Sequence, residues 1–221
     1  MTTSQQNENT LTSAISNEIA DNSIDLSLDY SELVLDSFLA DGVLKEIPFI
    51  KTIYAVGKIG VSIKERFFVK KLFVFLKEFH NQSIDTQKLN QFRSKFNSEE
   101  KYRNNVTEQI MIYLDTFLTL EKSKILAKLF KAHVDGNIDW EYFNHLSICL
   151  DSISPKAFPF LQQLSNHGFK IAEDKASQGI PRDGESEALL YACGVAYQTS
   201  SWSSGFNVSQ LGKDLYNFGM R

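Results

Sequence analysis

Two side chains that can ligate metal ions, His145 and Cys149, stand four residues apart. On a helix this spacing places both side chains on one face, as in some zinc sites. A structural zinc ion takes four protein ligands, and the chain has no second pair at a comparable spacing. We therefore interpret His145 and Cys149 as residues of a packed helix face, and we predict no metal site.

Sequence signatures of catalysis are also missing. The chain contains four His, and it has no G-x-S-x-G elbow, no P-loop and no glycine-rich dinucleotide fingerprint. Its two cysteines, Cys149 and Cys193, are too few for a disulfide framework and are typical of small buried side chains in a reducing cytosol. The sequence thus predicts a cytoplasmic protein that is not an enzyme and uses no cofactor.

The stretch HVDGNIDWEYF resembles the second half of an EF-hand calcium loop. Aligning Gly136 with the glycine of that loop puts Lys131 and His133 where carboxylates should stand. In the same alignment Glu141 comes one residue too early for the bidentate position. Calcium binding is therefore not expected. Instead, Gly136 is predicted to end one helix and Asp139 to cap the next.

A Gly-x-x-Gly loop occurs in the stretch AVGKIGVSIKERF, at Gly57 and Gly60. It resembles the loop with which KH domains clamp nucleotides. A KH domain needs strands around its helices, whereas the residues on both sides of this loop favour helices. We therefore predict that Gly57 and Gly60 let a helix or a bend approach its neighbour closely.

The net charge of −4 is unevenly distributed along the chain. Residues 1–41 carry eight acidic residues and no Lys or Arg, whereas residues 42–79 carry eight basic residues against three acidic ones. The remainder of the chain is close to neutral. Two interpretations are open: both segments are solvated faces, or the acidic segment covers the basic one.

The end of the basic segment is predicted to form a helix that reaches about His80. Its core face is apolar and consists of Phe68, Leu72, Phe75, Leu76 and Phe79. The opposite face mixes apolar and cationic side chains at spacings of three and four: Phe67, Lys70, Lys71, Val74 and Lys77. This face belongs either to a central helix whose lysines reach water, or to a contact surface for a partner protein or a peripheral anionic membrane.

Neither a secretory signal nor a membrane span is expected. The first residues lack the basic start and the apolar core of a signal peptide. The most apolar window is interrupted by Lys51 and Lys58, and charges near the middle of a bilayer are costly.

The positions of the helices can be predicted from caps and periodicity. Asp85 is predicted to cap a short helix that contains Phe92 and Phe96, and a further helix is expected to start after Thr119. Apolar residues recur at spacings of three and four residues from about residue 30, which predicts a mainly helical bundle. A small C-terminal helix–β-hairpin–helix appendage is expected to follow it. We predict a disordered polar and acidic arm over residues 1–24, the bundle over 25–168, a linker over 169–186 and the appendage over 187–221.

The C-terminal pattern is similar to the last third of a winged-helix domain. A helix end (ALLYAC), a strand (GVAYQTS), a turn (SWSSG), a strand (FNVS) and a helix (SQLGKDLYNFG) follow one another. The presumed wing has no Lys or Arg between Arg182 and Lys213, so the phosphate contacts of a DNA-binding wing are missing and nucleic-acid binding is not expected. Trp202 in the turn is either an exposed anchor for a partner or folded back on the last helix.

Three stretches resemble a group of uncharacterised bacterial accessory proteins that are often carried with mobile elements. They are LADGVLKEIPFIKTIYAVGKIGVSIKERFFVKKLFVFLKEF, KILAKLFKAHVDGNIDWEYFNHL and FNVSQLGKDLYNFG. The resemblance implies an intracellular bacterial protein in phage defence or a related stress response, with no defined activity. We predict a non-catalytic interaction protein that acts through protein–protein contacts, with homo-oligomers left open. The alternatives are a DNA-binding winged-helix regulator and a soluble protein that becomes membrane-active through its basic helix.

Overall fold

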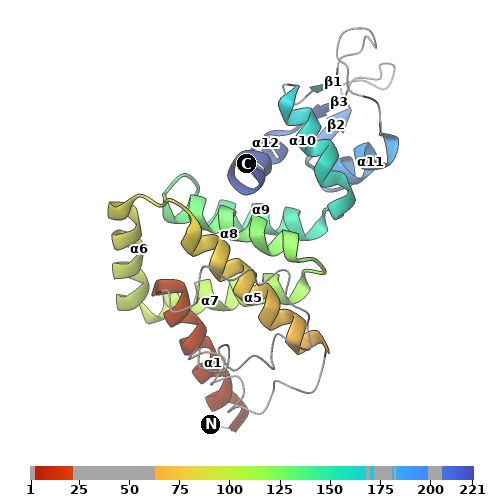
Figure 1. Cartoon of the computed structure of the whole chain (residues 1–221). Coiled ribbons are helices and arrows are strands. Elements are labelled where there is room, and N and C mark those ends of the chain that lie inside the picture. Colours follow the sequence, from red (N-terminus) through yellow and green to blue (C-terminus); the bar gives the residue numbers. More distant parts are fainter. Residues whose placement is uncertain (1–2, 22–62, 168–169, 172–180, 182, 199–205) are drawn as a thin grey trace.

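A computed structural model describes residues 3–21, 63–167, 170–171, 181, 183–198 and 206–221, and the structural statements below concern these residues. The chain is mainly helical, with a small antiparallel sheet near the C-terminus (Figure 1). The helices are α1 (Thr3–Ala20), α5 (Ile63–Asn81), α6 (Thr86–Ser98), α7 (Glu100–Thr116), α8 (Leu120–Val134), α9 (Trp140–Ser152), α10 (Phe158–Asn166), α11 (Gly184–Ala192) and α12 (Gln210–Leu215). A 3-10 turn, η1 (Pro155–Ala157), precedes α10, and a π-turn, η2 (Tyr216–Met220), follows α12. The predicted fold class is thereby confirmed.

Local capping sets the helix boundaries where the sequence predicted them. The carboxylate of Asp85 accepts a hydrogen bond from the backbone N–H of Lys88 at 2.9 Å, which starts α6. Asp139 accepts one from the N–H of Tyr142 at 2.7 Å and starts α9. Gly136, with φ of 75°, lies in the turn after α8, because glycine adopts the left-handed conformation without a Cβ clash.

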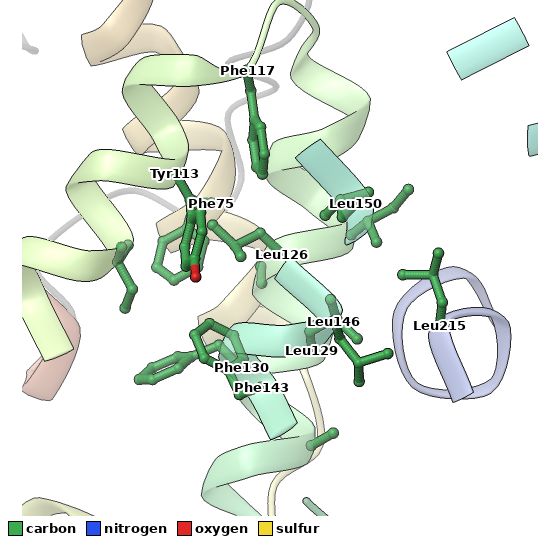
Figure 2. Close-up of a cluster of buried hydrophobic side chains, with 14 of the residues drawn as sticks. Phe75, Tyr113, Phe117, Leu126, Leu129, Phe130, Phe143, Leu146, Leu150 and Leu215 are labelled. Atoms are coloured by element: carbon green, nitrogen blue, oxygen red, sulfur yellow. The ribbon is translucent and has the colours of Figure 1, made fainter. Parts of the chain in front are cut away.

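Aromatic side chains fill the centre of the bundle, where α5, α7, α8 and α9 meet (Figure 2). The ring centroid of Phe130 lies 5.0 Å from that of Phe79, 5.8 Å from that of Phe143 and 6.0 Å from that of Phe75. Phe75, Phe130 and Phe143 are fully buried. Tilted and edge-to-face rings at these separations add to the stabilisation that comes from burying their area.

The N-terminal segment is ordered as a helix, which corrects the predicted disordered arm for residues 3–20. α1 packs against α6 and α7, and Ile15 and Ile19 are buried in the contact. The hydroxyls of Ser16 on α1 and Thr107 on α7 lie 3.0 Å apart. Polar composition suggested disorder, but apolar residues four apart on one face are sufficient to bury a short helix on a preformed surface.

The sheet joins three short strands in the order β1-β3-β2, all antiparallel. β1 is Lys170–Ile171, β2 is Ala196–Gln198 and β3 is Phe206–Val208. β1 lies within the predicted linker 169–186, and α11 begins before that linker was expected to end, so the linker prediction is wrong for these residues. The predicted hairpin strands are confirmed. The hydroxyl of Ser209 accepts from the N–H of Gly212 at 3.1 Å and caps the helix that follows.

The C-terminal elements pack on the bundle. η2 runs along α8, where a Cβ placed on Gly219 would come within 2.8 Å of Ile125 and 3.2 Å of Leu129. Leu215 of α12 is fully buried where α12 packs on α9 (Figure 2). None of the helices in the described part of the chain has both the length and the apolar character needed to cross a membrane.

Candidate functional site: the groove beside helix α11

The predicted contact face of α5 is largely buried. Lys70, Lys71 and Val74 are exposed to only 8%, 3% and 3%, and Phe67 and Lys77 are half-buried. The ammonium of Lys71 donates to the backbone carbonyl of Phe117 at 2.8 Å. The contact-surface interpretation is therefore wrong for Lys70, Lys71 and Val74, because α5 is a central helix enclosed by its neighbours. Burial lowers the pKa of Lys71, and the nearby Asp115 carboxylate opposes that shift.

The other residues singled out in the sequence do not form a site in the described structure. Trp202, Gly57 and Gly60 lie outside the described residues. Cys149 is buried, as expected, whereas His145 is exposed, so the two do not share a packed face. Within the described ranges, no three His, Cys, Asp or Glu side chains are grouped so that they could hold a metal ion.

A groove lies between α11 and the sheet. Figure 1 shows these elements in the C-terminal part of the molecule. The carboxylate of Asp183 caps α11 by accepting from the backbone N–H of Ser186 at 3.1 Å. Leu190 turns inward and is fully buried, while Ala188 and Tyr191 lie on the exposed side. The exposed residues Gly184, Ala188 and Tyr191 follow one another at spacings of four and three residues, which places them on one face of the helix.

The groove has a volume of about 230 Å³. It is lined by Gly184, Glu187, Ala188, Tyr191, Gln198 and Phe206. Phe206 is buried, and its ring centroid lies 6.3 Å from that of Phe160 on α10, so the groove has an apolar, supported base. Tyr191 is 61% exposed and stands at the side of the groove as a large, accessible aromatic ring. Because Gly184 and Ala188 are small, they leave open the space that longer side chains would fill.

The groove has an acidic side. Glu185 and Glu187 lie in the first turn of α11, and Glu187 lines the groove. No Lys or Arg occurs among the described residues 183–198 and 206–208. Two hydrogen bonds from Ser186, one from its hydroxyl and one from its backbone N–H, lower the pKa of the exposed Asp183 carboxyl. Glu187 is only 8% exposed and Glu185 pairs with the ammonium of Lys156 at 2.5 Å, so the acidic character at the start of α11 comes chiefly from the exposed carboxylate of Asp183.

A second polar cluster ties α9 to α12. The hydroxyl of Tyr142 donates to the carboxylate of Asp214 at 2.7 Å, and Asp214 also accepts from the side-chain amide of Gln210 at 2.9 Å. Burial first, then the hydrogen bond to Asp214 and its charge, raise the pKa of Tyr142 to about 12. A phenol with this pKa remains protonated near neutral pH, so Tyr142 acts as a hydrogen-bonding clamp between the two helices rather than as an acid–base group.

Sequence reasoning did not identify the groove, because the start of α11, residues 184–186, was assigned to a linker. A signal was present: Asp183 as an N-cap, followed by Gly184, Ala188 and Tyr191 at helical spacing. Chemically, the groove offers an apolar base, a phenol, an amide and a carboxylate, which suits the binding of a side chain or a peptide. Comparison of the chain with protein-family models, with curated proteins and with solved structures finds no significant match.

Proposed function

We propose that this chain is a non-catalytic interaction protein that binds a protein partner in the groove beside α11. The observation that carries the proposal is the exposed ring of Tyr191 beside a groove whose base is the buried Phe206. Tyrosine is enriched at protein–protein interfaces, and interface residues that dominate the binding energy cluster in well-packed pockets. The groove is large enough for one or two apolar side chains of a partner.

The charge around the groove supports a particular kind of partner. The exposed carboxylates of Asp183 and Glu185 at the start of α11, and the absence of Lys and Arg in the described residues 183–198, favour a segment with an apolar side chain next to Lys or Arg. The same charges would repel the phosphates of nucleic acid. The helix and hairpin order keeps a DNA-binding regulator as the second candidate, whereas the burial of Lys70 and Lys71 argues against the membrane-active alternative.

The test uses a random peptide display library selected on the purified full-length protein. We expect enriched peptides to carry an apolar residue beside Lys or Arg, and Tyr191→Ala to weaken their binding by about fivefold or more. The matched control is Tyr197→Ala. Tyr197 is also exposed, but it follows Ala196 on β2 and points to the opposite face of the sheet from Gln198.

Three results would contradict the proposal. They are selection of no peptide, equal weakening by Tyr191→Ala and Tyr197→Ala, and tight binding of duplex DNA with a steep salt dependence. The last of these would instead support the DNA-binding alternative.

The cellular setting is part of the same proposal. We place the protein in the bacterial cytoplasm, with phage defence as the role that the sequence resemblance implies. Plaque counts on cells with the gene intact, deleted or carrying Tyr191→Ala would test that role. Equal plaque counts in all three strains would exclude defence against the phages used and would leave the groove proposal to the peptide experiment.

A further inference from the structure

The two cysteines of the chain lie together although they are 44 residues apart in sequence. The Sγ of Cys149 on α9 is 3.7 Å from the carbonyl oxygen of Cys193, at the end of α11. Both are free thiols. Cys149 is 5% exposed and Cys193 is half-buried, so a small oxidant meets Cys193 first.

The backbone around Cys193 is suited to a cross-link. The carbonyl oxygen and Cβ of one residue are about 3 Å apart, so the Cβ of Cys193 lies no more than about 7 Å from the sulfur of Cys149. A disulfide requires the two Cβ atoms to lie about 3.5–4.5 Å apart. Cys193 caps α11 and is followed by Gly194 with φ of 71°, so it stands in a turn rather than inside a helix. The cross-link needs the turn at Cys193 and the Cys193 side chain to bring the two Cβ atoms into this range.

A buried cation lies beside the pair. The ammonium of Lys122 donates to the backbone carbonyl of Asp151, two residues after Cys149, at 2.6 Å. Burial raises the pKa of the Cys193 thiol, and the charge of Lys122 opposes that shift. Burial raises the pKa of Cys149 to about 12. Cys193 is thus the sulfur that ionises more readily and the one that solvent reaches, whereas Cys149 is held as a thiol behind it.

We propose that Cys149 and Cys193 are a redox modification site, in which a two-electron oxidant such as hydrogen peroxide converts the two thiols into one internal disulfide. The thiolate of Cys193 attacks a peroxide oxygen and becomes a sulfenic acid, and the cleaved peroxide bond releases hydroxide, which leaves as water after protonation. The sulfur of Cys149 then displaces the sulfenic oxygen as a second water. In sum, two thiols and one peroxide yield one disulfide and two waters.

The bond would join α9 to the turn between α11 and β2, two residues after Tyr191. It would thus fix the end of the helix that lines the groove. The modification site does not depend on partner binding in the groove, because it is defined by Cys149, Cys193 and Lys122 alone.

The experiment treats reduced full-length protein, at low micromolar concentration, with a small excess of hydrogen peroxide. We expect the free thiols to fall from two to none and the mass to decrease by two hydrogen atoms. The protein should remain monomeric on a non-reducing gel, and a proteolytic fragment should link the peptides of Cys149 and Cys193. Tm should rise by about 5 °C, because the cross-link restricts the unfolded chain, and dithiothreitol should reverse all these changes.

Two variants separate the roles of the sulfurs. In Cys149→Ser the sulfenic acid of Cys193 should persist and react with dimedone. In Cys193→Ser the thiol of Cys149 should remain unmodified over the same time. Retention of both thiols in the wild-type protein, conversion to intermolecular dimers, or equal reactivity of the two single variants would overturn the proposal.

Discussion

The ammonium group of Lys71 lies 2.8 Å from the backbone carbonyl oxygen of Phe117, and 3.1 Å from that of Asp115. These two carbonyls lie at the end of α7, where the last C=O groups of a helix have no partner within the helix. Lys71 is only 3% exposed, so its charge complements the negative end of the α7 dipole from inside the bundle. A residue that belongs to α5 thus terminates α7.

Replacing Lys71 should therefore destabilise the fold. We expect Lys71→Met to lower the free energy of unfolding by about 1–3 kcal/mol, because two carbonyls lose their donor. Urea denaturation followed by circular dichroism measures the change. The control is Lys124→Met on the exposed side of α8, for which we expect a change within about 0.5 kcal/mol. Equal stability of the two variants would show that the Lys71 cap contributes nothing.

The docking of α1 can be tested at Ile15, which is fully buried. We expect Ile15→Ala to destabilise the protein by about 2–4 kcal/mol, through lost apolar burial and the cavity left behind. The exposed Ser13 provides a control on the same helix, because Ser13→Ala removes no buried contact. Urea titrations measure the free energy of unfolding of both variants. If Ile15→Ala matched Ser13→Ala, α1 would not be part of the folded core.

Gly212 in α12 is predicted to tolerate no side chain. A Cβ at this position would lie 2.3 Å from the carbonyl oxygen of Val195 and 2.5 Å from a methyl carbon of Val208. The backbone oxygen has little room to move, so we expect Gly212→Ala to cost about 1–3 kcal/mol or more and to lower Tm.

The matched control for Gly212 is Gly184→Ala at the start of α11. A Cβ at Gly184 would meet no atom within 4 Å. We expect this variant to unfold within a few degrees of the wild-type protein, since it adds a methyl group to open space. Thermal unfolding of the two variants side by side distinguishes a steric effect from a general effect of replacing glycine, and similar Tm losses would contradict the steric explanation.

Stability should decrease as the pH falls below about 6.5, the ordinary value for histidine. The ring Nε2 of His80 donates to the carbonyl of Glu18, near the end of α1, at 2.8 Å. Burial has the largest effect on the pKa of His80 and lowers it, and the charge of Arg93 lowers it further. The hydrogen bond to Glu18 and the charge of Asp21 oppose this shift. The unfolded chain therefore takes up a proton at a higher pH than the folded chain does.

The stabilisation from neutral His80 is thus present above about pH 6.5 and is lost as the pH falls through the lower folded pKa. The slope contributed by one histidine is at most about 1.4 kcal/mol per pH unit. Urea titrations between pH 5.5 and 8 measure it. We expect His80→Gln, which keeps a donor toward Glu18, to have a shallower slope than the wild-type protein. His133, whose pKa is also lowered by burial, contributes to the slope that remains. Identical slopes would exclude His80 as a contributor.

The sequence by itself determined the helical class and most helix boundaries. Asp85, Asp139 and Ser209 cap their helices through hydrogen bonds to an N–H only three residues away. Gly136 lies in the turn after the helix it was predicted to end, two residues beyond Val134. Such signals depend on neighbours within one turn, and the apolar period of a helix depends only on its own geometry, so both can be predicted without knowing the tertiary structure.

Only the tertiary structure decided which faces are buried and what is brought together. The sequence around Lys71 could not reveal that its ammonium would contact a backbone carbonyl at the end of α7, 44 residues further along the chain. In the same way, β1 is two residues long and exists only because β3 pairs with it. The approach of Cys149 to Cys193 and the groove beside Tyr191 also depend on contacts distant in sequence. These contacts form because the whole chain packs so that little apolar surface remains exposed. Which surfaces meet depends on all the elements together and cannot be predicted from any local stretch.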